Sequence, residues 1–273
     1  MELIEILKVV VLGIVEGVTE WLPISSTGHM LLVDEFIHMN VSESFKDMFF
    51  VVIQLGAILA VVMLFWDKMW PFQTKDKSKP VICKDVFSMW FKVVVACIPG
   101  AIVTLLFDDY IEAHLHTPTV IALALVVYGV AFIVIENWNK KRTPKVLALE
   151  DISYKTAFII GLFQVLSIIP GTSRSGSTII GALTIGVSRV AAAEFTFFLA
   201  VPVMIGLSFI KILKFGFSFT SVELMTLAIG CVVAFLVSVL VIKFLMSYIK
   251  KRDFKIFGWY RIVLGVILLL YFM

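Results

Sequence analysis

Six long apolar segments constrain the fold of this chain more than any other feature of its sequence. An α-helix needs roughly 20 residues, with a lower limit near 17, to cross the hydrocarbon core of a bilayer. Hydrophobic residues make up 60% of the 273 residues and charged residues only 16%, against about 45–50% and about 25% in soluble domains. The sequence therefore predicts an all-α integral membrane protein with six transmembrane helices. The expected spans are 48–66, 90–107, 118–136, 195–214, 224–246 and 256–273.

Two further apolar regions are interrupted by polar residues. Residues 5–37 are broken at EGVTEWLPISSTG, and residues 156–188 are broken at IIPGTSRSG. Each arm is only about 10 to 16 residues long, which is too short to cross the hydrocarbon alone. We therefore expect two re-entrant helix–loop–helix segments, each of which enters and leaves by the same face of the membrane.

The distribution of Lys and Arg agrees with six crossings. The connections 67–89, 137–155 and 247–255 are rich in Lys and Arg, as is typical of cytoplasmic loops, and the alternate connections are poorer. Full crossings by the arms of the broken regions would preserve the same alternation. The prediction of re-entrance therefore depends on arm length and not on charge.

The order of elements repeats along the chain. A broken region followed by three spans occupies residues 1–139, and the same order occupies residues 150–273. Local echoes support the repeat, since GIVEG matches GLFQV and LPISSTG matches IPGTSRSG. Because three crossings is an odd number, the second half must be inserted upside down. The sequence predicts one membrane domain with an inverted-topology repeat, whose broken helices meet near the bilayer midplane.

The two breaks bring together groups that suit a phosphate. Glu16 and Glu20 are four residues apart and so share one face of a helix. Hydroxyl groups stand at the expected N-terminus of the next helix in both breaks, and the second break adds Arg174. A helix N-terminus behaves as roughly half a positive charge, so two of them with a guanidinium favour a phosphate or pyrophosphate. The predicted substrate-binding residues are Ser25, Thr27, Gly28, Thr172, Ser173, Arg174, Ser175, Gly176 and Thr178.

The carboxylates indicate a metal ion. Alone, Glu16 and Glu20 would repel a phosphate that approached them closely. A divalent cation held by both and shared with phosphate oxygens removes this conflict, because Mg²⁺ favours one or two carboxylates plus substrate oxygens. An ionisable residue at membrane depth costs about 2.5–3.5 kcal/mol, so several of them indicate a functional site.

A hydroxyl beside a base and a phosphate predicts phosphoryl transfer. Ser26 is the expected nucleophile, and either Glu20 or His29 is its base. Arg174 is expected to stabilise charge on the transferring phosphoryl group, or to act as a counter-ion to the glutamates. Attack by a metal-bound water is the rival mechanism. Simpler roles remain open as well: Ser25 and Ser175 as helix caps, and His29 as a hydrogen-bond partner of a loop carbonyl.

EGVTEWLPISSTGH together with PGTSRSGST resembles the bacterial undecaprenyl-pyrophosphate phosphatase family associated with bacitracin resistance, over essentially the whole chain. The resemblance implies hydrolysis of a polyisoprenyl pyrophosphate to the monophosphate lipid carrier of peptidoglycan synthesis. It also implies Mg²⁺ or Ca²⁺, the bacterial inner membrane, and an active site open to the periplasmic or extracellular side. The catalytic residues that it implies are Glu16, Glu20, Ser25, Ser26, His29, Ser173 and Arg174.

Other functional classes fit the sequence less well. Inverted repeats with broken helices also occur in secondary transporters, so a transporter or flippase for an anion or a lipid-linked phosphate is the alternative. A transporter needs no activated hydroxyl, and the E-x-x-x-E pair beside consecutive serines favours the enzyme. Carboxylates would oppose a permeant anion in a passive channel. The net charge of +3 is too small and dispersed for a nucleic-acid partner, while a homodimer and the prenyl chain length stay open.

Overall fold

The computed structural model describes residues 2–73, 81–115 and 117–272, without the side chains of residues 31 and 108–113. Met273 in the last predicted span and residues 74–80 of the first basic connection thus lie outside the described residues. The described residues form helices and no β-sheet, apart from isolated β-bridges. The helices are α1 (Leu3–Thr19), α2 (Ser26–Phe36), α3 (Glu43–Val52), α4 (Gln54–Leu64), α5 (Trp66–Met69), α6 (Lys84–Leu115), α7 (Pro118–Asn139), α8 (Tyr154–Val165), α9 (Arg174–Thr184), α10 (Arg189–Phe215), α11 (Ser221–Ile249) and α12 (Lys255–Phe272), with a 3₁₀ turn at Leu166–Ile168.

Six helical segments of the described chain are long and apolar enough to cross a membrane, which confirms the predicted number of spans. They are Glu43–Leu64, Lys84–Phe107, Pro118–Asn139, Arg189–Phe215, Ser221–Ile249 and Lys255–Phe272. Most extend beyond the apolar runs because polar residues cap them. Ser188 caps α10, so this helix begins at residue 189 instead of 195. Thr220 and Glu223 form a capping box at the start of α11.

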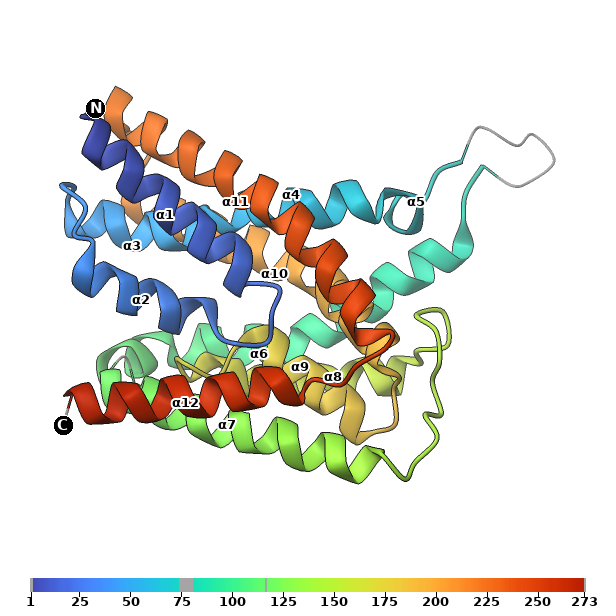
Figure 1. The fold of residues 1–273 in the computed structure, drawn as a ribbon. Helices are drawn as coiled ribbons and strands as arrows, with labels where there is room; N and C mark the ends of the chain where they lie inside the picture. Colours follow the sequence, from blue (N-terminus) through green and yellow to red (C-terminus); the bar gives the residue numbers. More distant parts are fainter. Residues whose placement is uncertain (1, 74–80, 116, 273) are drawn as a thin grey trace.

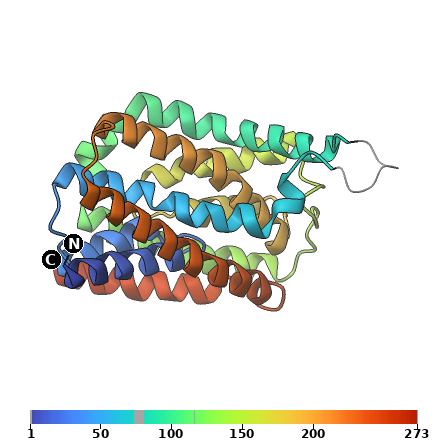
Figure 2. The ribbon, with the colours of Figure 1, turned by 90° about the horizontal axis from the view of Figure 1, so that it is seen from above.

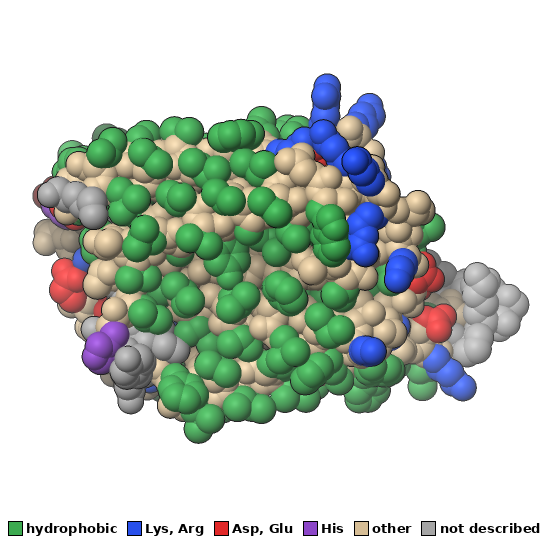
Figure 3. Space-filling model, turned by 90° about the horizontal axis from the view of Figure 1, so that it is seen from below, with side chains coloured by type: hydrophobic (Ala, Val, Ile, Leu, Met, Phe, Trp, Pro, Cys, Tyr) green, Lys and Arg blue, Asp and Glu red, His purple; other side chains and the backbone are tan. Residues whose placement is uncertain are grey.

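The long helices run roughly along the long axis of the molecule, and their connections lie at its two ends (Figures 1 and 2). Both termini lie at one end, which we call the terminal end (Figure 1). Connections rich in Lys and Arg, including residues 140–145 and 250–252, lie at the other, which we call the basic end. Figure 3 shows a hydrophobic lateral surface with Lys and Arg collected toward one end. This distribution is typical of a multi-pass membrane protein.

The two interrupted regions form helical hairpins. In the first hairpin, residues 3–36, α1 runs inward from the terminal end and α2 returns to it (Figure 1). In the second hairpin, residues 154–184, α8 runs inward from the basic end and α9 returns to it. Close approach requires glycine in both: a Cβ at Gly17 would lie 2.8 Å from the Ala234 carbonyl oxygen, and one at Gly161 would lie 2.4 Å from that of Ala96.

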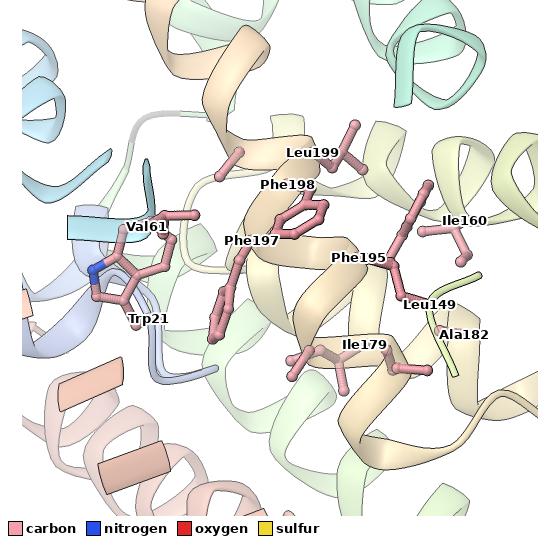
Figure 4. Close-up of a cluster of buried hydrophobic side chains, with 14 of the residues drawn as sticks. Trp21, Val61, Leu149, Ile160, Ile179, Ala182, Phe195, Phe197, Phe198 and Leu199 are labelled. Carbon is pink, nitrogen blue, oxygen red and sulfur yellow. The ribbon is translucent and has the colours of Figure 1, made fainter. Parts of the chain in front are cut away.

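The turn of the first hairpin is anchored in the hydrophobic core. Trp21 directly follows Glu20 and is fully buried. Its ring meets Phe197 of α10 edge-on, with ring centroids 5.3 Å apart, and both belong to the cluster in Figure 4. An aromatic pair of this geometry contributes about 0.5–1.5 kcal/mol beyond its buried area. The packing of Trp21 therefore holds the neighbouring carboxylate in a defined place.

Candidate active site

The turns of the two hairpins meet at the carboxylate of Glu20. Ser26 Oγ, at the start of α2, donates a hydrogen bond to Glu20 Oε2 at 2.6 Å. Arg174 Nη2, at the start of α9, donates to Glu20 Oε1 at 2.8 Å. Glu20 is the C-cap of α1, directly after its last residue, and is only 5% exposed. One buried carboxylate thus binds the first helical residue of each hairpin's second arm, as the expected meeting of the two breaks requires.

Both turns use the same local backbone. Ser25 caps α2 and accepts a hydrogen bond from the Gly28 N–H at 3.3 Å, and Ser173 caps α9 and accepts from the Gly176 N–H at 3.1 Å. Their φ angles are +77° and +71°, which no other described non-glycine residue shares in sign. Such backbone costs about 1–3 kcal/mol per residue and concentrates at functional sites. When the two sequences are aligned at their capping residues, Ser25 and Ser173, the residue Ser26 corresponds to Arg174.

Of the two serines for which a capping role was left open, Ser25 is a cap and Ser175 is not. Ser175 does not cap α9, since Ser173 occupies that position. Ser175 Oγ instead donates to the backbone carbonyl of Glu20 at 3.3 Å and lies 3.1 Å from Ser173 Oγ. This hydroxyl therefore adds a second link between the two turns.

Glu16 is a buried carboxylate that accepts no hydrogen bond from an N–H or O–H donor of the described residues. It is 0% exposed, and its carboxyl group lies within hydrogen-bonding reach of Glu20, so the two acidic groups are in direct contact. A buried charge in this state is costly unless a cation or a proton neutralises it. Two neighbouring carboxylates, one with open lone pairs, suit a divalent cation. The described residues contain no cluster of three acidic, His or Cys ligands, so further ligands would come from substrate or water.

Both nitrogens of His29 are engaged. Nδ1 lies 2.7 Å from the Ser25 carbonyl oxygen, and Nε2 lies 2.7 Å from the Tyr260 hydroxyl. A carbonyl only accepts, so Nδ1 carries the hydrogen and Nε2 of the neutral ring accepts the Tyr260 proton. The two rings stack, with centroids 5.6 Å apart. Because Ser26 already donates to Glu20, the geometry favours Glu20 over His29 as the base.

Tyr260→Phe tests this assignment. The variant loses one hydrogen bond, worth about 1 kcal/mol, and leaves the Ser26–Glu20 contact intact. We expect a small fall in Tm and less than about a tenfold fall in the rate of phosphate release from a polyisoprenyl pyrophosphate, the expected substrate. Thermal melts and initial rates measure both, with Tyr271→Phe, an exposed tyrosine of the same helix, as the control. A loss beyond a hundredfold would place the His29–Tyr260 pair in proton transfer.

Arg261 of α12 ties the two turns together, and it was not among the predicted site residues. It is 0% exposed; Nη1 donates to the Pro23 carbonyl at 3.1 Å, and Nη2 donates to the Gly171 and Thr172 carbonyls at 2.8 and 2.9 Å. Its signal in the sequence was a lone arginine in an apolar span, which indicates a functional or structural requirement.

The remaining predicted residues occupy different surroundings. Arg174 Nη1 donates to the Thr196 carbonyl at 3.0 Å, and the Thr178 and Thr196 hydroxyls lie 2.9 Å apart, so Thr178 holds α9 against α10. Thr172 is fully buried, and its hydroxyl has no partner among the described residues. Thr27 is exposed. Of these residues, Arg174 therefore belongs to the contacts at Glu20, whereas the Thr178 hydroxyl stabilises the packing of the helices around them.

Comparison with known proteins extends over the whole chain. The bacitracin resistance protein BacA family matches residues 9–267. A protein of Enterococcus faecalis named undecaprenyl-diphosphatase is 74% identical over 270 residues, which are 99% of this chain and 98% of that protein. Proteins of the same name from Lachnoclostridium phytofermentans and Desulfitobacterium hafniense are each 62% identical over 273 residues, covering all of this chain and 99% and 98% of their own lengths. These matches confirm the resemblance drawn from the two motifs.

Proposed function

The chain belongs to the bacitracin resistance protein BacA family, and we propose that it is an undecaprenyl-diphosphatase of the bacterial inner membrane. The reaction would split the terminal phosphate from undecaprenyl pyrophosphate and leave the monophosphate, the lipid carrier of peptidoglycan synthesis. The observation that carries this proposal is the double contact at Glu20, where a buried carboxylate binds both a serine hydroxyl and an arginine. This arrangement offers a base, a nucleophile and a charge-stabilising group at one point.

We propose that the two hairpins are re-entrant and belong to inverted halves, residues 1–139 and 150–273. Equivalent helices pair in support of this: α1 packs on α11 as α8 packs on α6, and α7 packs on α12 as α4 packs on α10. Gly13 and Gly161, which match in the echoed motifs, both lie against these partner helices. With the basic end in the cytoplasm, the first hairpin opens to the outer side.

The same orientation supports an active site that is open to the outer side. A groove of about 230 Å³ reaches from Gly28, in the first turn of α2, to Phe272, near the end of α12. Its walls are apolar at Leu32, Ile121 and Leu268, and they also include Glu35 and Asp34, whose carboxylate is paired with Lys46 at 2.9 Å. A groove of this kind suits a prenyl chain that leaves the polar site sideways into lipid.

In the proposed mechanism, Glu20 takes the proton of Ser26 while Ser26 Oγ attacks the terminal phosphorus. The bond from that phosphorus to the bridging oxygen breaks, and the lipid monophosphate leaves. Water then hydrolyses the phosphoserine to inorganic phosphate. Arg174 moves from Glu20 to the phosphoryl oxygens, where the first-turn N–H groups of α2 and α9 also donate.

We propose that Mg²⁺ or Ca²⁺ is held by Glu16 and Glu20. The support is the buried carboxylate of Glu16, which accepts no hydrogen bond from a described N–H or O–H group and lies in contact with Glu20. When bound, the cation offsets repulsion between the carboxylates and the pyrophosphate.

Phosphate release by purified protein in detergent tests the activity. We expect release from a polyprenyl pyrophosphate without any ion gradient, loss of about 90% or more of the rate in EDTA, and recovery when Mg²⁺ or Ca²⁺ is added back. Phosphate release distinguishes hydrolysis from transport, since a transporter or flippase would release none. Activity that is indifferent to the chelator would remove the metal from the proposal and leave the phosphatase.

Ser26→Ala tests the covalent route. We expect a fall in rate of about a thousandfold or more, because no hydroxyl remains to attack phosphorus. Ser218→Ala, which removes an exposed serine hydroxyl in the connection between α10 and α11, is the control and should stay close to the wild-type rate. Acid quenching with radiolabelled substrate should trap a phosphoserine at Ser26. Full activity of Ser26→Ala would favour direct attack by water.

A further inference from the structure

A cavity of about 750 Å³ lies at the basic end, separate from the contact at Glu20. Its walls come from the end of α7, residues 142–145, the connection between α9 and α10, and the end of α11. The helix α9 runs between the two places, since Arg174 at its start contacts Glu20 and Thr184 at its end lines the cavity. The cavity is therefore a second polar hollow, which the proposed reaction does not use.

The cavity carries an excess of positive charge. Glu136 is the acidic residue among the described lining residues, and it is fully buried. Its carboxylate accepts hydrogen bonds from Arg189 Nε at 2.9 Å, from Arg189 Nη2, and from the Phe254 N–H at 2.9 Å, so it is already neutralised. The basic residues that line the cavity are Lys140, Arg142, Lys145, Arg189 and Lys250.

The walls are fixed by hydrogen bonds between segments that are distant in sequence. The Lys145 N–H donates to the Gly186 carbonyl at 2.7 Å, and the Ser188 N–H donates to the Val146 carbonyl at 2.8 Å. Asn139 Nδ2 donates to the Leu183 carbonyl at 3.0 Å. These contacts join the segment after α7 to the connection between α9 and α10. The backbone of the hollow is thus held in place by contacts within the protein, and the exposed Lys140, Arg142, Lys145 and Lys250 extend from it.

The orientation of the chain in the membrane does not by itself explain why five basic residues line one cavity. A cytoplasmic bias of Lys and Arg requires only that they lie near the ends of the spans. Elsewhere at the basic end, Lys68 lies 2.8 Å from Glu194 and Lys255 lies 3.1 Å from Asp253, so each faces a carboxylate. In the cavity, five basic residues surround one carboxylate that Arg189 already binds.

We propose that this cavity binds a phosphate group, and that its source is the headgroup of an anionic membrane lipid or a free phosphate ion. Arg and Lys are the residues that bind phosphate with charge-assisted hydrogen bonds. The Arg142 guanidinium lies 3.9 Å above the ring of Trp138, a half-exposed residue of α7. Tryptophan is enriched at the level of lipid headgroups, which places the rim of the cavity where such a phosphate lies.

Thermal melts of the purified protein in neutral detergent test the proposal. The probes are short-chain phosphatidylglycerol, phosphatidylcholine with the same acyl chains, and inorganic phosphate. The cavity variant is Lys140→Gln, Arg142→Gln and Lys145→Gln together. The matched control, Lys141→Gln, Lys155→Gln and Lys251→Gln, removes the same charge from exposed residues outside the cavity.

We expect phosphatidylglycerol to raise the Tm of wild type and control saturably, and phosphatidylcholine to have little effect. The cavity variant should need about tenfold more phosphatidylglycerol for the same rise. A rise with inorganic phosphate at similar concentrations identifies the free ion as ligand, whereas a rise with the lipid alone identifies the headgroup. Equal weakening in the control, or no saturable rise with either probe, overturns the proposal. If the triple variant does not fold, Lys145→Gln alone is compared with Lys141→Gln in the same way.

Discussion

Arg174→Ala is expected to lower kcat/KM for a polyprenyl pyrophosphate by about a thousandfold or more, because arginines that stabilise a transferring phosphoryl group contribute about 10³–10⁵ in rate. Arg174 Nη2 donates to Glu20 at 2.8 Å and Nη1 donates to the Thr196 carbonyl at 3.0 Å, so the guanidinium lies beside the proposed nucleophile and base and needs only to exchange Glu20 for the phosphoryl oxygens. Steady-state phosphate release measures the loss, and a thermal melt shows that the variant is folded.

Two further substitutions serve as comparisons for the rate of Arg174→Ala. Arg174→Lys retains the charge and loses the planar, two-pronged donor, so we expect a rate between those of wild type and Arg174→Ala. Arg252→Ala removes an exposed arginine at the basic end and should leave the rate unchanged. If Arg174→Ala stayed within tenfold of wild type, the arginine would be only a counter-ion to Glu20, and the proposed phosphate site would be wrong.

Much of the architecture could be predicted from the sequence because the length of an apolar run is a one-dimensional property. A run of about 20 apolar residues can cross a bilayer and a run of 10 to 16 cannot, so the six spans and the two broken regions were visible without coordinates. Polar residues at the breaks were equally visible, since Glu20, Ser26 and Arg174 stand out in apolar surroundings. Their meeting was expected from the predicted inverted repeat, and the structure shows the contacts at Glu20.

The details of the site depend on backbone geometry, which residue types did not reveal. A positive φ usually indicates glycine, but Ser25 and Ser173 adopt it here, so the true cap of α9 was not recognised. The choice between Glu20 and His29 required distances, because both lie near Ser26 in sequence. Arg261 is far from both motifs in sequence, and only the packing of α12 brings it to the two turns.

Arg261→Leu is expected to be the most destabilising single substitution in the site. Three buried carbonyls, at Pro23, Gly171 and Thr172, would lose their donor, and each unsatisfied group costs about 1–3 kcal/mol. The total is comparable to the stability of a typical domain, so we expect little folded protein or a fall in Tm of more than about 10 °C. Purification yield and thermal melts measure the loss, with Arg252→Leu as the exposed control.

Arg261→Lys separates an effect on the turns from an effect on charge. A single ammonium cannot reproduce a guanidinium that donates to both turns, because its three donors share one nitrogen. We therefore expect a folded variant with an intermediate Tm and a lower kcat, since the Ser26–Glu20–Arg174 contacts depend on how the turns are placed relative to each other. A variant with wild-type Tm and wild-type kcat would show that the contacts at Glu20 align the turns without Arg261.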